Sequence, residues 1–133
     1  MKIEELLIKH ENLKLKPYKD TKGILTIGVG RNLEDNGISE DEAMYLLEND
    51  IKIVEQELKD IFPNFDKLPE NVRLVLIDMI FNLGKPRFMK FRHMIEAVKN
   101  RDWGAMIKEM KNSKWCEQVK SRCMDNVKLI NMI

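Results

Sequence analysis

Residues 10–30 read HENLKLKPYKDTKGILTIGVG, and this stretch decides the fold class. Apolar and polar residues alternate on both sides of a DTKG tetrapeptide, a pattern typical of two strands joined by a turn. We expect strands over residues 15–18 and 24–29, with the turn at 20–23. Glycines at 28 and 30 let the chain turn tightly out of the second strand. The sequence therefore predicts a β-hairpin near the start of the chain.

Sequences with helical periodicity flank this hairpin. Apolar residues spaced i, i+3, i+4 and i+7 predict a short amphipathic helix over residues 1–11. Ser39 and Glu42 are spaced as a capping box at the start of a helix of more than twenty residues, which ends before Pro63. Residues 70–83 are apolar almost all round, so we expect them to form the central buried helix.

The expected architecture is α+β, predominantly helical, because further helices are predicted at about 90–99, 103–111 and 117–131. We expect a small lobe over residues 12–38 and a connecting helix over 39–62. A helical lobe over 63–133 follows, with helix 1–11 packing on it.

Composition restricts the function classes. The chain has 133 residues, 44% of them hydrophobic, which suits one domain or two closely packed lobes. A formal net charge of +1 gives no signal for nucleic-acid binding. No apolar run approaches the ~18 residues of a membrane span, and acids interrupt the apolar start, so we expect neither a membrane anchor nor a signal peptide. Synthesis in the cytoplasm is the resulting expectation.

The two cysteines, Cys116 and Cys123, have no zinc-site spacing. On one straight helix they would lie roughly 10 Å apart along the axis, too far for a disulfide. We therefore expect reduced cysteines that pack in the interior.

Three residues around the hairpin have the chemistry of glycoside cleavage, which needs one protonated and one ionised carboxyl. Glu11 ends an apolar helix, where the hairpin can shield it and raise its pKa. Asp20 lies in a polar turn, where it stays ionised, and Thr26 returns near it on the second strand to hold a water. The spacing alone is weak evidence, because the chain has 22 acids and two nearby surface carboxylates are common.

The same stretch resembles the catalytic signature of the phage T4-type lysozyme family, glycoside hydrolase family 24. The shared features are a Glu ending the first helix, an Asp before a turn and a T-I-G-x-G strand. Residues 78–84, DMIFNLG, resemble the family's central helix, and 113–122, SKWCEQVKSR, its closing segment. The resemblance covers nearly the whole chain. It is weakest over residues 31–45, where part of the family's small lobe is missing.

The resemblance implies that Glu11 is the general acid, while Asp20 and Thr26 position and activate the attacking water, with inversion at the anomeric carbon. It also implies supporting or substrate-binding roles for residues that are equally open to simpler interpretations. These residues are Arg122, Asn82, Phe81 and Gly30.

Each supporting residue has a simpler alternative. Arg122 matches a family Arg that pairs with the acid, but it is also an ordinary surface Arg. Asn82 can bind an N-acetyl group or cap its own helix, and Phe81 fits the core better. Trp103 and Trp115 are expected in the core.

Arg31 departs from the family, which commonly has His there. We expect it to pair with Glu34 or Asp35, without titrating near neutrality.

The implied function is a peptidoglycan hydrolase, an endolysin that cleaves the β-1,4 bond between N-acetylmuramic acid and N-acetylglucosamine. The alternatives are a lytic transglycosylase of related fold and a catalytically silent peptidoglycan-binding protein. The resemblance suggests a phage or prophage enzyme for host cell lysis. It would wait in the host cytoplasm for a holin-type partner to permeabilise the membrane. We expect a monomer without cofactor or metal, since His10 and His93 belong to no ligand cluster.

Overall fold

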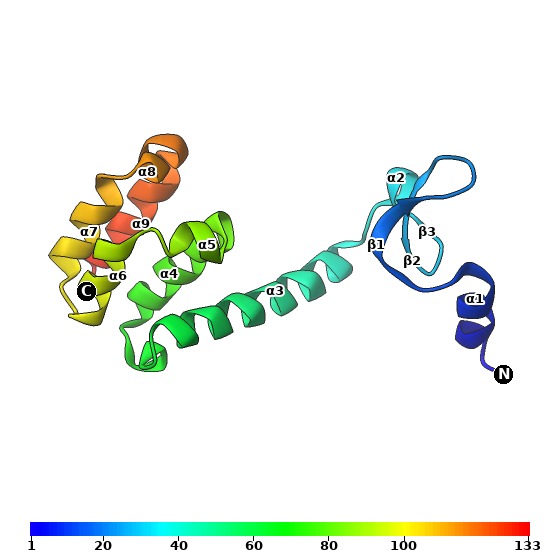
Figure 1. Cartoon of the computed structure of the whole chain (residues 1–133), viewed down its shortest axis with the longest axis horizontal. Coiled ribbons are helices and arrows are strands. Elements are labelled where there is room, and N and C mark those ends of the chain that lie inside the picture. The colour runs from blue at the N-terminus through cyan, green and yellow to red at the C-terminus, as the bar shows by residue number, and fades with distance from the viewer. The chain divides into compact units, whose positions relative to one another are not determined.

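The computed structural model describes all 133 residues, which form nine α-helices, one short 3₁₀ helix and a three-stranded antiparallel sheet (Figure 1). The predicted fold class, α+β and predominantly helical, is confirmed. The chain divides into two compact units, residues 1–47 and 48–133. The division falls within the long helix α3 (Glu40–Ile61). The expected packing of helix 1–11 on the helical lobe stays a prediction.

The first unit contains the predicted hairpin. Its elements are α1 (Ile3–Glu11), β1 (Lys14–Lys19), β2 (Leu25–Gly28), β3 (Arg31–Asn32) and α2 (Leu33–Asn36). Strands β1 and β2 pair antiparallel, with Tyr18 opposite Thr26 and Lys19 opposite Leu25. The sequence pattern missed the two-residue strand β3, which pairs with β2, and the four-residue helix α2, because both are too short for a hydrophobic pattern to repeat.

The predicted capping box at the start of α3 is confirmed. The Glu42 N–H donates to Ser39 Oγ over 3.1 Å, and the Ser39 N–H donates to Glu42 Oε1 over 2.8 Å. Two backbone donors at the helix start are thereby satisfied by side chains.

Arg31 pairs with Glu42 over 2.6 Å, so the expected pairing with Glu34 or Asp35 is wrong. Asp35 is engaged by Asn32, which caps α2 and donates to the Asp35 carboxylate over 2.9 Å. Arg31 instead donates to Glu42, whose carboxylate also accepts from the Ser39 N–H in the capping box of α3.

The second unit is entirely helical and begins within α3, at Glu48. Its elements are η1 (Phe65–Lys67), α4 (Glu70–Leu83), α5 (Lys85–Phe88), α6 (Arg92–Lys99), α7 (Trp103–Lys111), α8 (Lys114–Val119) and α9 (Ser121–Asn131). The predicted central helix, residues 70–83, matches the bounds of α4. No helix in the chain has both the length and the apolar character needed to cross a membrane.

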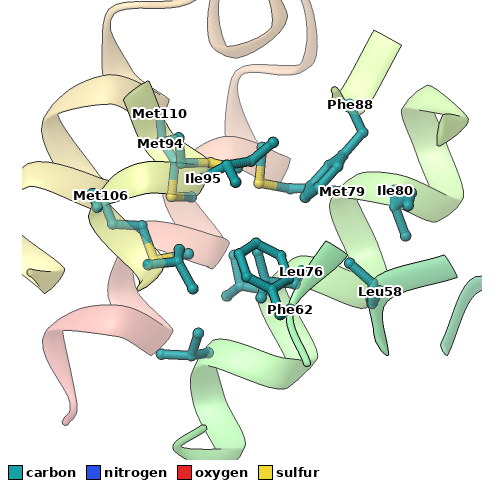
Figure 2. Packing of buried hydrophobic residues seen from close by; sticks show 14 of the residues in the cluster. Leu58, Phe62, Leu76, Met79, Ile80, Phe88, Met94, Ile95, Met106 and Met110 are labelled. Carbon is teal, nitrogen blue, oxygen red and sulfur yellow. The ribbon is translucent and has the colours of Figure 1, made fainter. Parts of the chain in front are cut away.

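The hydrophobic core lies in the second unit, where every buried apolar residue falls between Leu58 and Ile130. Figure 2 shows Phe62 beside Leu76 in this cluster, and Phe88 beside Met79. Burying side chains of this size contributes about 1.5–3 kcal/mol each. The core therefore gives the second unit a rigid frame for the polar residues on its helices.

The expected single helix over 117–131 is wrong, because the chain breaks at Lys120, which has a φ of 46°. Helix α8 ends before this residue and α9 begins after it. The break brings Cys116 and Cys123 to a Cα–Cα distance of 5.1 Å, and the two form a disulfide. The prediction of reduced cysteines assumed one straight helix, and it fails for that reason.

Candidate active site

Glu11 is the last residue of α1, which ends because Asn12 takes a positive φ of 67°. Its carboxylate lies against the backbone of Gly30, at the turn between β2 and β3. A Cβ atom added at Gly30 would come within 2.7 Å of Glu11 Oε2. Gly30 also has a φ of +64°, which side-chain-bearing residues rarely adopt. Only glycine therefore allows this carboxylate to rest on the end of the sheet.

The hairpin shields Glu11 less than the sequence suggested. The residue as a whole is exposed, and its contact with Gly30 covers only one side of the carboxyl group.

Asp20 lies in the turn that joins β1 to β2, as predicted. Its Oδ1 atom accepts hydrogen bonds from the backbone N–H groups of Lys22, over 2.8 Å, and Ile24, over 2.9 Å. Its own backbone N–H donates to the Ile24 carbonyl, which extends the strand register by one pair. One carboxylate oxygen is thereby fixed, while Oδ2 accepts no hydrogen bond from the protein.

Thr26 lies on β2 and is buried, with 4% of its surface exposed. Its hydroxyl donates to the Ile24 carbonyl over 2.8 Å, which leaves the oxygen lone pairs as acceptors. Asp20 faces Ile24 and Tyr18 faces Thr26, so the two-residue period of a strand puts Asp20 and Thr26 on one face of the hairpin. A water between them would meet acceptors on both sides.

Arg122, on α9, is held by Asp78 of α4 through three hydrogen bonds. Its Nε atom donates to Asp78 Oδ2 over 3.0 Å and its Nη2 atom to Oδ1 over 2.8 Å, with a longer bond to the Asp78 carbonyl. Asn126, one turn further along α9, donates to the same carboxylate over 2.9 Å. Arg122 is therefore held by Asp78, while 38% of its side chain stays exposed.

This cluster shifts two pKa values. Partial burial raises the pKa of Asp78, but hydrogen bonds from Arg122 and Asn126 and the guanidinium charge outweigh it, so the pKa is lowered overall. The hydrogen bond to Asp78 raises the pKa of Arg122. Both groups are therefore ionised throughout the neutral range.

The Oδ1 atom of Asn82 accepts a hydrogen bond from Trp115 Nε1 over 2.8 Å. Trp115 is buried, as expected, and meets Phe91 edge to face. Trp103 packs against the core, also as expected. Phe81 is 44% exposed, so the expectation that it belongs to the core is wrong. Its side chain lies outside the packed face of α4.

Comparison with known proteins assigns the family. A family model described as phage lysozyme matches residues 8–127. The chain belongs to the phage lysozyme family. It is 26% identical to "Probable T4-type lysozyme 1" and 25% identical to "Probable T4-type lysozyme 2", both of Dictyostelium discoideum. In each case the match covers 90% of this chain and 88% of the relative.

A third relative is "Pre-baseplate central spike protein Gp5" of Enterobacteria phage T4, which is 28% identical over 92% of this chain and 26% of its own length. Membership of the phage lysozyme family supports a lysozyme-type peptidoglycan hydrolase as the class of function. Glu11, Asp20 and Thr26 lie within the matched range.

Sequence reasoning on this phage lysozyme missed Asp78 and Asn126. The available signal was the pair of polar residues, Asp78 and Asn82, spaced four apart in the otherwise apolar second half of α4. Such a pair predicts a polar stripe along one face of α4. Nothing in the sequence names its partners, which lie 33 and 44 residues further along the chain.

A depression of about 850 Å³ also lies within the first unit, lined mostly by apolar side chains that include Leu15, Ile27 and Tyr45. None of Glu11, Asp20 and Thr26 lines it. Charged side chains also border it, among them Asp41 and the ion-paired Arg31 and Glu42.

Proposed function

We propose that this phage lysozyme is a muramidase that cleaves the β-1,4 bond between N-acetylmuramic acid and N-acetylglucosamine with inversion. The observation that carries the proposal is the arrangement of the hairpin. Glu11 rests on Gly30 at one end of the sheet, and Asp20 and Thr26 share one face of the hairpin. Family membership supports the substrate class.

The two carboxyl groups divide the chemistry. Glu11 donates its proton to the glycosidic oxygen as the bond to the anomeric carbon breaks. A water held by the free Oδ2 of Asp20 and by the Thr26 oxygen attacks that carbon from the opposite face. Asp20 accepts the proton of the water. The N–H groups of Lys22 and Ile24 donate to Oδ1 of Asp20 and fix the orientation of its carboxylate. The Oδ2 atom is thereby kept free to bind the water.

The supporting roles of the other residues also belong to the proposal. Gly30 positions the acid through its backbone contact. Arg122 supports the acid, Asn82 offers its amide nitrogen to the substrate while its oxygen binds Trp115, and Phe81 offers an exposed ring. The family resemblance supports these three assignments.

We further propose that the enzyme is monomeric and is made in the cytoplasm of a bacterial host. A holin-type partner would give it access to the wall, as the resemblance to phage endolysins implies. Fractionation of an expressing cell tests this step. Release of the enzyme to the wall only after a permeabilising partner is co-expressed supports it, and release without such a partner contradicts it.

The experiment that tests the proposed function is product analysis on purified peptidoglycan. Hydrolysis leaves reducing N-acetylmuramic acid ends, whereas a lytic transglycosylase leaves 1,6-anhydro ends. Proton NMR of the first product shows an α-anomer if the bond is inverted. Asp20→Asn should lose about 100-fold or more in rate, while Asp125→Asn, an exposed control, should not. Anhydro ends, or an undiminished rate for Asp20→Asn, would overturn the mechanism.

A further inference from the structure

The face of the hairpin that carries Asp20 and Thr26 also carries an aromatic ring and a cation. Tyr18 lies directly opposite Thr26 in the pairing of β1 with β2, so the two side chains are neighbours on one face. The Lys14 ammonium lies over the Tyr18 ring, with Nζ 4.2 Å from the ring centroid. The ammonium is therefore on the same face as the groups proposed to hold the attacking water.

The ring holds this ammonium in a defined place. An aromatic face attracts a cation through its quadrupole, which limits the directions that a flexible lysine side chain takes. The Cα atom of Lys14 lies opposite Gly28, which is one two-residue period, or roughly 7 Å, along β2 from Thr26. The side chain reaches from there to the Tyr18 ring, so its charge is directed along the strand toward the position of Thr26.

No acidic side chain of the protein pairs with this ammonium. The ion pairs of the chain involve other cations, and Lys14 is exposed. Residues 12–30 contain three more exposed lysines, Lys16, Lys19 and Lys22, and their only acid is Asp20. Cations thus outnumber acids by four to one on the hairpin, although the whole chain has a formal net charge of only +1. A positive surface of this kind attracts an anionic ligand.

Peptidoglycan carries the complementary charge on its peptides. The sugar rings are uncharged, and in intact peptidoglycan the lactyl group of N-acetylmuramic acid is joined to a stem peptide that has free carboxylates. An ammonium group donates charge-assisted hydrogen bonds to a carboxylate. Because the stem peptide is attached to the sugar at which the bond is cut, a cation on the face of the water-holding pair lies within the region that the peptide occupies.

We propose that Lys14, held over Tyr18, binds a stem-peptide carboxylate of the substrate. Lys16, Lys19 and Lys22 add longer-range attraction for the same anions. This inference rests on the proposed function. It deepens that function by naming the residue of the hairpin that recognises a part of the substrate other than the sugars.

Co-sedimentation with peptidoglycan sacculi tests the proposal, in a Glu11→Gln background that keeps the sacculi intact. One sample of sacculi retains its carboxylates, and in the other they are converted to uncharged amides with a carbodiimide and ammonia. We expect Lys14→Gln to weaken binding to the first sample about 2-fold to 5-fold, the range of an exposed ion pair. On the amidated sample the difference from the unchanged Lys14 should disappear. Lys108→Gln, the same change at an exposed lysine of α7, is the matched control and should not weaken binding.

Two further measurements distinguish positioning by Tyr18 from a purely structural role. Tyr18→Leu should weaken binding to the carboxylated sacculi, but should cause no further loss in a Lys14→Gln background. Tyr18→Phe, which keeps the ring, should retain most of the binding that Tyr18→Leu loses. Added salt should reduce the effect of Lys14→Gln, because salt screens exposed charges.

The outcomes are separable. Undiminished binding by Lys14→Gln, an equal loss in Lys108→Gln, or a loss that persists on amidated sacculi would overturn the inference. A wild type that binds sacculi but releases no reducing ends would instead contradict the proposed function. The comparison of Lys14→Gln on the two samples would still decide whether Lys14 binds a carboxylate.

Discussion

Glu11 owes its position to the absence of a side chain at residue 30. The Glu11 carboxylate and the Gly30 backbone are so close that a methyl group would collide with Oε2 at 2.7 Å. Such a collision displaces the flexible partner first, so the catalytic acid moves rather than the strand. A methyl group at residue 30 is therefore expected to lower the activity of the protein by more than its loss of stability explains.

We predict that Gly30→Ala lowers kcat about 100-fold through displacement of Glu11. It should also lower the free energy of unfolding by about 1–2 kcal/mol through the left-handed backbone. The matched control is Gly37→Ala, which has a φ of +59° and no neighbour within 4 Å. Steady-state kinetics and urea unfolding should show a similar loss of stability in both variants, with a loss of kcat only at residue 30. Equal kcat values would contradict this account of Gly30.

The three residues proposed as catalytic form a local motif in the sequence, whereas the contacts of Arg122 do not. Glu11, Asp20 and Thr26 lie within sixteen residues and form a local motif, so their spacing carries the signal. Asp78 meets Arg122 across 44 residues, and only the packing of α4 on α9 brings them together. The exposure of Phe81 likewise depends on which face of α4 packs against the core. The sequence of α4 is apolar almost all round, so its pattern does not show which face that is.

At the scale of elements, the start of α3 links the sheet to the long helix. Glu42 accepts from the Ser39 N–H and also pairs with Arg31 of β3. The hydrogen bond from Arg31, together with those involving Ser39, lowers the pKa of Glu42 from 4.5 to about 2. A carboxyl group whose pKa falls on folding stabilises the folded state above its unfolded pKa.

We predict that the stabilisation by Glu42 is present above pH 4.5 and is lost as the pH falls from 4.5 to about 2. The difference in Tm between the wild type and Glu42→Gln should therefore shrink across this window. Glu48→Gln, on an exposed site of the same helix, serves as the control and should show no such window. A difference in Tm that stays constant with pH would exclude a charged role for Glu42.

The break between α8 and α9 is an element-scale feature that the sequence pattern missed. Residues 117–131 have no Gly or Pro to mark an interruption, and Lys120 adopts a positive φ against its preference. Ser113 caps α8, and the disulfide between Cys116 and Cys123 closes the break. Local patterns predicted the longer helices, such as α4 and α7, within a few residues.

We predict that reduction of the disulfide lowers the free energy of unfolding by about 2–3 kcal/mol, the loop-closure value for a short loop. Urea unfolding with and without dithiothreitol measures this difference, and a Cys116→Ala/Cys123→Ala variant should show none. Mass spectrometry of the native protein should find it lighter than the reduced form by two hydrogen atoms. Equal masses would mean that the thiols are free.

At the scale of the whole molecule, stability and chemistry lie in different parts of the chain. Every buried apolar residue belongs to residues 58–130, whereas Glu11, Asp20 and Thr26 belong to residues 1–47. The sequence patterns predicted a small sheet in a predominantly helical chain, and the structure confirms this fold class. Substitutions of the catalytic groups should therefore change the rate of cleavage while thermal unfolding of the core stays the same.

The central claim is that Glu11 is the proton donor of a peptidoglycan hydrolase, and release of reducing ends from purified peptidoglycan tests it most directly. The wild type, Glu11→Gln and the exposed control Glu34→Gln should share one Tm. We predict that Glu11→Gln loses about 100-fold or more in rate, since an amide cannot donate the proton, while Glu34→Gln retains the wild-type rate. A Glu11→Gln variant that releases reducing ends at the wild-type rate would contradict the account.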